Sequence, residues 1–260
     1  SGEMQGGVMS PGAVAVEGAD LTVNGNVSDG LVSDGATLTV NGNVTGNGIN
    51  TVVAKKGTVT VNGTVTATDL NRQTGVLASN GSKLTVGDTE VGGKESTGVI
   101  AESGSKATAG NVKVSGEYMT GASAYGDSTV HVKGDVTATG ENSVGIDGET
   151  GTIKVGGDVS GIEAVVARGE AVGGSVSGTL SGIVAVGNAS VSVKGDAETK
   201  VGPGVFAQEN ATVTVDGNVT GGTFYEAPEG YEYVYPAIIA GAGTTVIVKG
   251  TVSTAERNFF

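Results

Sequence analysis

The stretch ATVTVDGNVTG, Ala211–Gly221, alternates small polar residues with branched apolar ones and then breaks at Asp-Gly. Nearly the same phrase occurs as ATLTVNGNVTG at Ala36–Gly46 and as GTVTVNGTVTA at Gly57–Ala67. Alternation with a period of two is typical of a β-strand that buries one face, and Asp-Gly and Asn-Gly are turn signals. We therefore expect the valines of each phrase to point inward and the threonines to point outward.

The phrase is the second half of a longer unit, approximately G-[VIL]-x-A-x-x-G-[AST]-x-[VIL]-x-V-x-G-x-V-[ST]-G. Anchored on the last apolar residue of its second extended piece, the unit occurs in 11 copies, spaced 17 to 25 residues apart except for a final interval of 33. The anchors are Val23, Val40, Val61, Val86, Ala109, Val132, Val155, Val172, Val193, Val215 and Val248. One copy cannot bury its apolar side, but stacked copies close a continuous core.

The repeat predicts an all-β fold, a single-stranded parallel β-helix of about 11 coils with three short strands per coil. The variable coil length favours a right-handed helix. At about 4.8 Å between paired strands, the rod would be roughly 50 Å long. We expect an N-terminal extension over residues 1–11, the β-helix over 12–253 with a Tyr-rich insertion at 223–236, and a C-terminal tail over 254–260.

Composition narrows the chemistry. The 260 residues include 48 Gly, no Cys, no Trp and one His, with a net charge of −13. Phosphate binding needs clustered Lys and Arg, so the charge disfavours nucleic acid. No apolar run approaches the roughly 20 residues of a membrane-spanning helix, so we expect no direct membrane insertion. With no Cys and only His131, neither a thiol nucleophile nor a Cys/His zinc site can form, and we expect no cofactor.

From Gly12 to Ser253 the coils resemble the pectin-lyase-like right-handed β-helices. In repeat style they are more similar to the Gly-, Val-, Thr- and Asn-rich regions of bacterial cell-surface adhesin-like and autotransporter-passenger proteins. This resemblance implies export, an extracellular or cell-surface location in a bacterium, and a role as a stalk or adhesive rod.

One column of the stack contains candidates for catalysis, because it collects Glu102, Asp147 and Arg168 directly after the first-strand alanines. Two carboxylates two coils apart would stand roughly 9–10 Å from each other, a separation that suits inverting glycoside hydrolysis. Arg168 would hold a uronate carboxylate. An ordinary cross-coil Asp147–Arg168 pair explains the same residues.

Two turn columns carry Asn or Asp. Stacked amides hydrogen-bond from coil to coil in other stacked β arrays, so we expect ladders through Asn24, Asn41 and Asn62 and through Asn26 and Asn43. Asp135 and Asp158 occupy the equivalent turn one coil apart, and a shared Ca²⁺ ion is a weaker alternative there.

The middle residue of the first strand is apolar in most copies. If alternation is strict, these side chains form an outer stripe that marks an assembly or docking surface; if the strand bends at a corner or a loop covers it, they are buried. The stripe comprises Val53, Leu77, Ile100, Val166, Val184, Phe206 and Ile239, begins with Val14 and Val32, and is interrupted by Ser123 and Gly145.

The insertion TFYEAPEGYEYVYP, Thr223–Pro236, lengthens the last interval. Clustered tyrosines suit carbohydrate or protein contact, although the segment would also serve as a flap over the rod. Its aromatic residues are Phe224, Tyr225, Tyr231, Tyr233 and Tyr235. Neither end carries a helical cover, and open sheet edges invite pairing. We therefore expect either a longer repeat protein or self-association through the coil ends or the stripe.

These observations favour a non-enzymatic, exported rod that binds a carbohydrate or protein surface. A polysaccharide lyase or glycoside hydrolase of the pectin-lyase-like type is the alternative. A polymer-forming or ice-ordering protein is a third, because Thr precedes many anchors.

Overall fold

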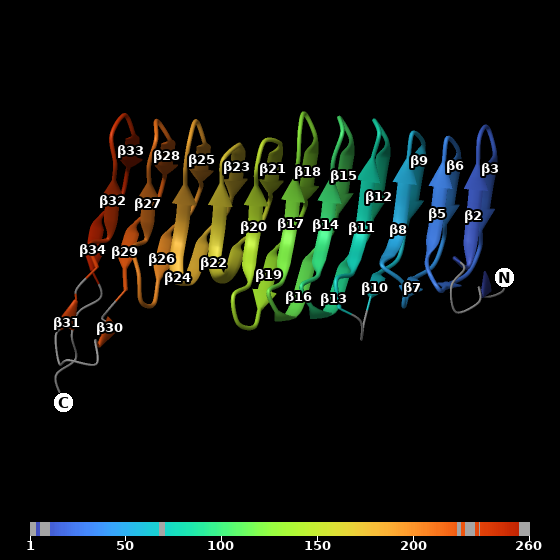
Figure 1. Cartoon of the computed structure of the whole chain (residues 1–260), viewed down its shortest axis with the longest axis horizontal. Helices are drawn as coiled ribbons and strands as arrows, with labels where there is room; N and C mark the ends of the chain where they lie inside the picture. Colours follow the sequence, from blue (N-terminus) through green and yellow to red (C-terminus); the bar gives the residue numbers. More distant parts are fainter. Residues whose placement is uncertain are drawn as a thin grey trace.

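The computed structural model describes residues 4–5, 11–67, 71–222, 225–226, 232–233 and 235–254. Over these residues the chain contains strands and no helix. Its strands stack in parallel along one long axis, so that the protein is a β-solenoid with its coils in sequence order (Figure 1). The predicted all-β parallel β-helix is therefore confirmed.

Each coil passes along three sides. The first side is formed by the first strand of each coil, which follows the turn from the third strand of the preceding coil. It comprises β2 (Ala13–Val16), β5 (Leu31–Asp34), β8 (Asn50–Lys55), β11 (Thr74–Ser79), β14 (Thr97–Ala101), β17 (Thr120–Ala124), β20 (Val144–Gly148), β27 (Val205–Ala207), β32 (Ile238–Ala240) and the C-terminal parts of β22 (Val159–Ala167) and β24 (Val176–Ala185).

The second side is an 11-stranded parallel sheet that contains one strand from each repeat copy. It comprises β3 (Asp20–Val23), β6 (Thr37–Val40), β9 (Thr58–Val61), β12 (Lys83–Val86), β15 (Lys106–Ala109), β18 (Thr129–Val132), β21 (Thr152–Val155), β23 (Glu170–Gly173), β25 (Ser190–Val193), β28 (Thr212–Val215) and β33 (Thr245–Val248).

The third side is joined to the first in a 21-stranded sheet. It comprises β4 (Val27–Ser28), β7 (Val44–Gly46), β10 (Val65–Ala67), β13 (Thr89–Lys94), β16 (Val112–Glu117), β19 (Val136–Thr139), β26 (Ala197–Thr199), β29 (Val219–Gly221), β34 (Val252–Thr254) and the N-terminal parts of β22 and β24. Within the predicted N-terminal extension, β1 (Met4–Gln5) pairs in parallel with β4 and so adds to this side.

In the described part of the chain, eight coils have three strands of their own. The remaining coils share β22 and β24, each of which runs without a break from the third side of one coil to the first side of the next. The predicted number of separate three-stranded coils was therefore slightly too high.

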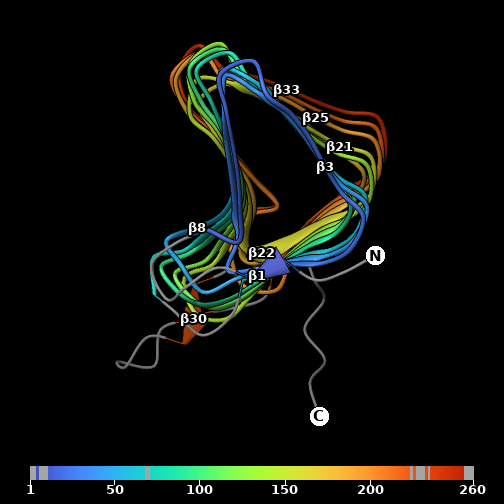
Figure 2. The same cartoon turned by 90° about the vertical axis from the view of Figure 1, so that its right-hand side faces the viewer.

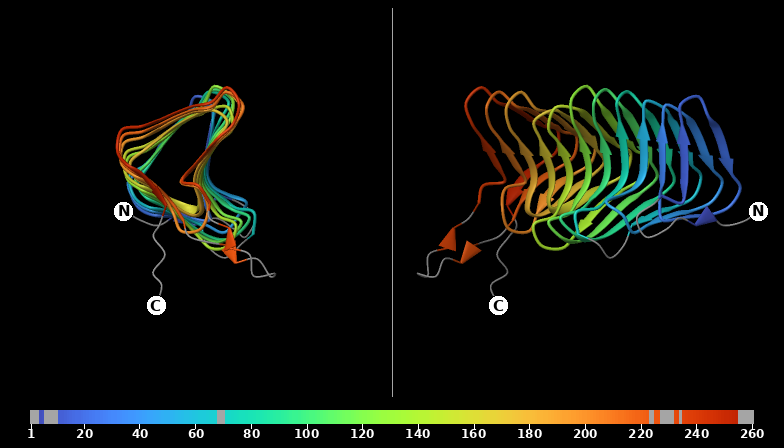
Figure 3. Two further views of the ribbon diagram at one scale, coloured as in Figure 1. Left: turned by 90° about the vertical axis from the view of Figure 1, so that its left-hand side faces the viewer. Right: turned by 45° about the vertical axis from the view of Figure 1, so that its right-hand side comes forward.

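The solenoid is right-handed. Viewed from the N-terminal end, the chain runs up the first side, down the second and back along the third, which is clockwise as the coils recede (Figure 2). The first side bends inward between the top corner and a lobe at the opposite corner (Figure 2). This lobe is formed by the turns that join third strands to first strands. The same outline is visible from the opposite end (Figure 3).

The core is a stack of valines, alanines and a few larger aliphatic residues. In β28 the predicted alternation holds, since Val213 and Val215 are fully buried while Thr212 is exposed and Thr214 is half-buried. In β27 both Val205 and Ala207 are buried. Burying one such valine contributes about 1.5–3 kcal/mol, and each coil needs its neighbours to do so.

The predicted amide ladders are present at the turn after the second side. The Nδ2 atom of Asn41 donates to Oδ1 of Asn24 at 2.8 Å, and Nδ2 of Asn62 donates to Oδ1 of Asn41 at 2.7 Å. In the next column the side chain accepts from the backbone of the following coil: the N–H of Asn43 donates to Oδ1 of Asn26 at 2.9 Å. Both ladders satisfy polar groups that face the coil corner.

One anchor was placed wrongly. In the eighth copy the register pairs Val172 with Lys154 and Ser192, both of which point outward. Gly173 therefore occupies the inward anchor position, opposite Val193, and Ala171 is the buried residue before it. In the sequence Ala-Val-Gly-Gly the only branched side chain lies one position before the inward anchor, so the repeat pattern predicts the anchor one residue too early.

Candidate binding surface

The predicted apolar column on the first side exists and faces outward. Along the first strands Val14, Val32, Val53, Leu77, Ile100, Ser123, Asp147, Val166, Val184, Phe206 and Ile239 are paired from coil to coil. We refer to these residues as the apolar stripe. Their neighbours in each strand, such as Val76 and Ala78 on either side of Leu77, point into the core.

The stripe is shielded to different extents. Val14 is 52% exposed, whereas Val53 is 5% exposed, and most of the other members are half-buried. The first side is concave (Figure 2), and side chains on a concave face are more crowded by their neighbours than those on a flat face. The side chains of the stripe are therefore both outward-facing and partly buried, although the alternation in the sequence predicted either one or the other.

The register corrects one member of the stripe. Asp147, and not Gly145, pairs with Ser123 and with Val166. Gly145 belongs to a column with Gly98 and Gly121, in which a Cβ atom would lie 2.4–2.5 Å from the carbonyl oxygen of the next coil. A side chain at these three glycines would push the next coil away, and the recurring Thr-Gly at the start of β14 and β17 is the signal that would have revealed the column.

The same correction divides the proposed catalytic set. Asp147 does not share a column with Glu102 and Arg168, because Gly148 takes the place of the first-strand alanine. Glu149 follows Gly148 and is the residue that meets Arg168, with Oε1 3.8 Å from the guanidinium Nη1. Both partners are about half exposed, so this ion pair contributes little stability.

Asp147 is the most unusual acid on this face. Burial raises the pKa of its carboxyl group, the charge of Glu149 raises it further, Arg168 opposes the change and Glu163 adds to it. Its Oδ1 atom is buried without a hydrogen-bond partner in the described part of the chain. A carboxylate in a column of aliphatic side chains is thus poorly satisfied by the protein itself.

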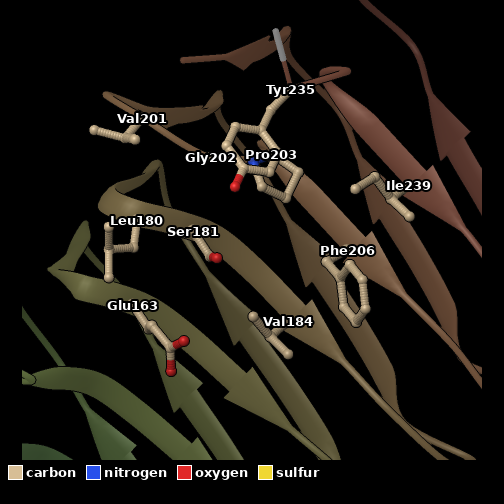
Figure 4. Close-up of a pocket in the computed structure, with 10 residues that line it drawn as sticks. All are labelled: Glu163, Leu180, Ser181, Val184, Val201, Gly202, Pro203, Phe206, Tyr235 and Ile239. Atoms are coloured by element: carbon tan, nitrogen blue, oxygen red, sulfur yellow. The ribbon is translucent and has the colours of Figure 1, made fainter. Parts of the chain in front are cut away.

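Towards its C-terminal end the stripe becomes the floor of a groove of about 460 Å³ (Figure 4). Val184, Phe206 and Ile239 form the floor, one residue from each of three successive coils. Leu180, the segment Val201–Pro203 and Tyr235 stand along the lobe side. Leu180 is 48% exposed, the exposure of a large apolar residue with incomplete packing.

Glu163 lies at the N-terminal end of this groove, where β22 has an irregular register between Gly161 and Glu163. Together with Leu180 it also lines a second hollow of about 150 Å³, whose other residues include Asn142 and Val144. The two hollows therefore adjoin along the rod axis, with one carboxylate at their junction. Glu163 was not singled out from the sequence, because its place depends on that irregular register.

Among the aromatic residues of the insertion, Tyr235 alone lies where its side chain is described, and it borders the groove at 36% exposed. β30 (Tyr225–Glu226) and β31 (Glu232–Tyr233) pair as an antiparallel hairpin beside the last coils (Figure 1). The predictions for Phe224 and Tyr231 fall outside the described residues, and those for the Tyr225 and Tyr233 side chains do as well.

The two acids proposed to share Ca²⁺ already have partners. Oδ1 of Asp135 accepts from the backbone N–H of Asp158, and Oδ1 of Asp158 accepts from that of Ser175 at 2.8 Å. Within the described ranges, no three acidic or His side chains gather in a way that would hold a metal ion. Asp135 and Asp158 are therefore members of the corner ladder.

No protein-family model, curated protein or solved structure matches this chain. The part of the chain that the structure describes contains no helix with the length and hydropathy of a membrane crossing. The fold and the surface of the first side are thus the basis for assigning a role.

Proposed function

We propose that this protein is a non-enzymatic, exported bacterial β-helix that acts as an adhesin-like rod and binds a protein or carbohydrate surface through its first side. The observation that carries the proposal is the apolar stripe, which is unbroken over the four coils from Val166 to Ile239 and opens there into a groove bordered by Tyr235. Continuous outward-facing apolar surface of this kind is typical of interaction sites. The rigid stack of coils would hold it at a fixed height on a cell surface.

A binding assay tests this role. The purified chain is applied to a glycan array and to an array of extracellular proteins, and cells are treated with protease to ask whether the chain is reachable from outside. Phe206→Asp places a charge on the groove floor and should abolish binding. Thr85→Asp, an exposed position on the second side, adds the same charge and should leave binding intact. Equal binding by both variants would contradict the assignment to the first side.

A polysaccharide-degrading enzyme remains the second candidate, and the raised pKa of the Asp147 carboxyl group is the observation that favours it. A general acid needs a proton near neutral pH, which burial and nearby carboxylates promote. Turnover of a polysaccharide that is lost in Asp147→Asn and retained in Thr85→Asp would establish this activity. Binding without turnover would support the rod.

A further inference from the structure

The groove on the first side is chemically one-sided. Its lining is mostly aliphatic or aromatic, with Leu180, Val184, Phe206 and Ile239 as the main apolar contributors, while the charged and hydroxyl groups come from Glu163, Ser181 and Tyr235. A sugar chain carries a hydroxyl group on most of its carbons, and each one that is buried on binding would need a polar partner. Apolar side chains need none. The lining therefore favours an occupant with apolar side chains over a glycan.

The groove also has a direction. Its floor residues are stacked one per coil, so the groove runs parallel to the rod axis (Figure 4). The second hollow shares Glu163 and Leu180 with it and continues it towards the N-terminal coils. From Val144 to Ile239 the two hollows together advance four coils, or about 19 Å at 4.8 Å per coil. A fully extended peptide of about six residues has this length. The shape therefore suits an extended segment laid along the rod.

Charge fixes one end of such a segment. Glu163 makes no ion pair within the described part of the chain. One coil towards the N-terminus, Asp147 in the stripe holds Oδ1 buried without a partner, and Glu149 beside it meets Arg168. Three carboxylates thus face one guanidinium, and the whole chain carries −13. A cation is the complement to this end of the groove.

We propose that the groove binds an extended peptide segment of a partner protein, with apolar side chains over Val184, Phe206 and Ile239 and a Lys or Arg at Glu163. This proposal rests on the proposed function and names its partner as protein. The apolar contacts supply affinity, and the cation sets the register and direction of the segment.

A pair of blocked hexapeptides provides the probe. Acetyl-Lys-Leu-Ser-Leu-Ser-Leu-amide and the reversed order present the Lys at either end, and matched peptides with ε-N-acetyl-lysine keep the size and remove the charge. Each is titrated into the full chain with ¹³C-labelled methyl groups. The methyl signals of Leu180, Val184 and Ile239 report on the groove, and Ile247, 48% exposed on the second side, serves as the internal control.

The expected result is a shift of the groove methyl signals, none at Ile247, and binding about tenfold weaker for the acetyl-lysine peptide, which corresponds to about 1.4 kcal/mol. Glu163→Gln should remove the preference for Lys. Glu198→Gln, the same change at an exposed position on the third side, should keep it. Equal affinity for a Lys peptide and its ε-N-acetyl-lysine counterpart would overturn the proposal, and so would a preference for Lys that survives Glu163→Gln.

Other occupants give different results. If residues 224–233 of the chain itself fill the groove, replacing them with a Gly-Ser linker will shift the groove methyl signals without any peptide, and the proposal fails. If a glycan from the array shifts these signals and the peptides do not, the peptide assignment fails while the adhesive role stands. Peptide binding without attachment to any array or cell would instead preserve the groove assignment and remove the adhesive role.

Discussion

The Oδ1 atom of Asp135 accepts a hydrogen bond of 2.9 Å from the backbone N–H of Asp158, one coil further along the rod. The same bond recurs wherever this corner carries Asn or Asp, for example between Asn111 and the N–H of Asp135 at 3.0 Å. It is interrupted after Thr64 and Ser175, whose short hydroxyl side chains make no such bond in the described part of the chain. The acids in this column are thus structural acceptors between coils.

If Asp135 acts as a hydrogen-bond acceptor, its negative charge is dispensable, whereas its Oδ1 atom is required. Asp135→Asn keeps Oδ1 and should change the free energy of unfolding by only a few tenths of a kcal/mol. Asp135→Ala leaves the N–H of Asp158 without its partner and should cost about 1 kcal/mol. Urea denaturation of the two variants measures the difference. Equal losses in both would show that the carboxylate charge, rather than the bond, matters.

The glycine before Asp158 is required by the same contact. A Cβ atom on Gly157 would lie 2.0 Å from Oδ1 of Asp135 and 2.9 Å from the backbone carbonyl carbon of Gly134. Gly157→Ala should therefore destabilise the protein by more than Asp135→Ala, roughly 2 kcal/mol or more. Combining it with Asp135→Ala should recover part of the loss, because one of the two clashes disappears. A fully additive double variant would contradict this account.

Calcium should have no effect at this corner. Because Asp135 and Asp158 each commit Oδ1 to a backbone N–H, a shared cation would have to displace both hydrogen bonds. We expect the same melting temperature, within about 1 °C, in 1 mM Ca²⁺ and in EDTA. A Ca²⁺-dependent rise that vanishes in Asp135→Asn would instead establish a metal site.

The fold was predictable because every copy of the repeat has the same alternation of inward-facing apolar and outward-facing polar residues. Val213 and Val215 are buried in one coil for the reason that Val40 and Val61 are buried in others, and a single misread copy does not alter the stack. The ladder through Asn24, Asn41 and Asn62 could be predicted on the same basis.

The surface was less predictable because it depends on register at single residues. A shift of two positions in one copy moved Asp147 from the column after the alanines into the apolar stripe, and so separated it from Glu102. Glu163 depends on an irregularity between two strands that no repeat pattern encodes. Partial burial of the stripe follows from the concave first side, which is a property of the stacked coils and not of any one copy.

The position of Asp147 predicts a measurable cost at neutral pH. Its pKa is raised from the ordinary value of 3.8, so the folded state binds a proton more tightly than the unfolded state. Stability from this group is therefore greatest below pH 3.8 and is lost as the pH rises through the raised pKa. Asp147→Val, which continues the column towards Val166, should raise the free energy of unfolding at pH 7 by about 1 kcal/mol or less, since it removes a charge that burial and Glu149 disfavour and that partial exposure screens.

The gain should shrink as the pH is lowered and disappear near pH 3, where Asp147 is protonated in both states. Urea denaturation of the wild type and of Asp147→Val at several pH values gives the difference directly and cancels the titration of the other acids. Glu198→Val removes a carboxylate from an exposed position and should show no comparable gain at pH 7. A gain for Asp147→Val that stays constant from pH 3 to pH 7 would mean that packing, and not the buried charge, accounts for it.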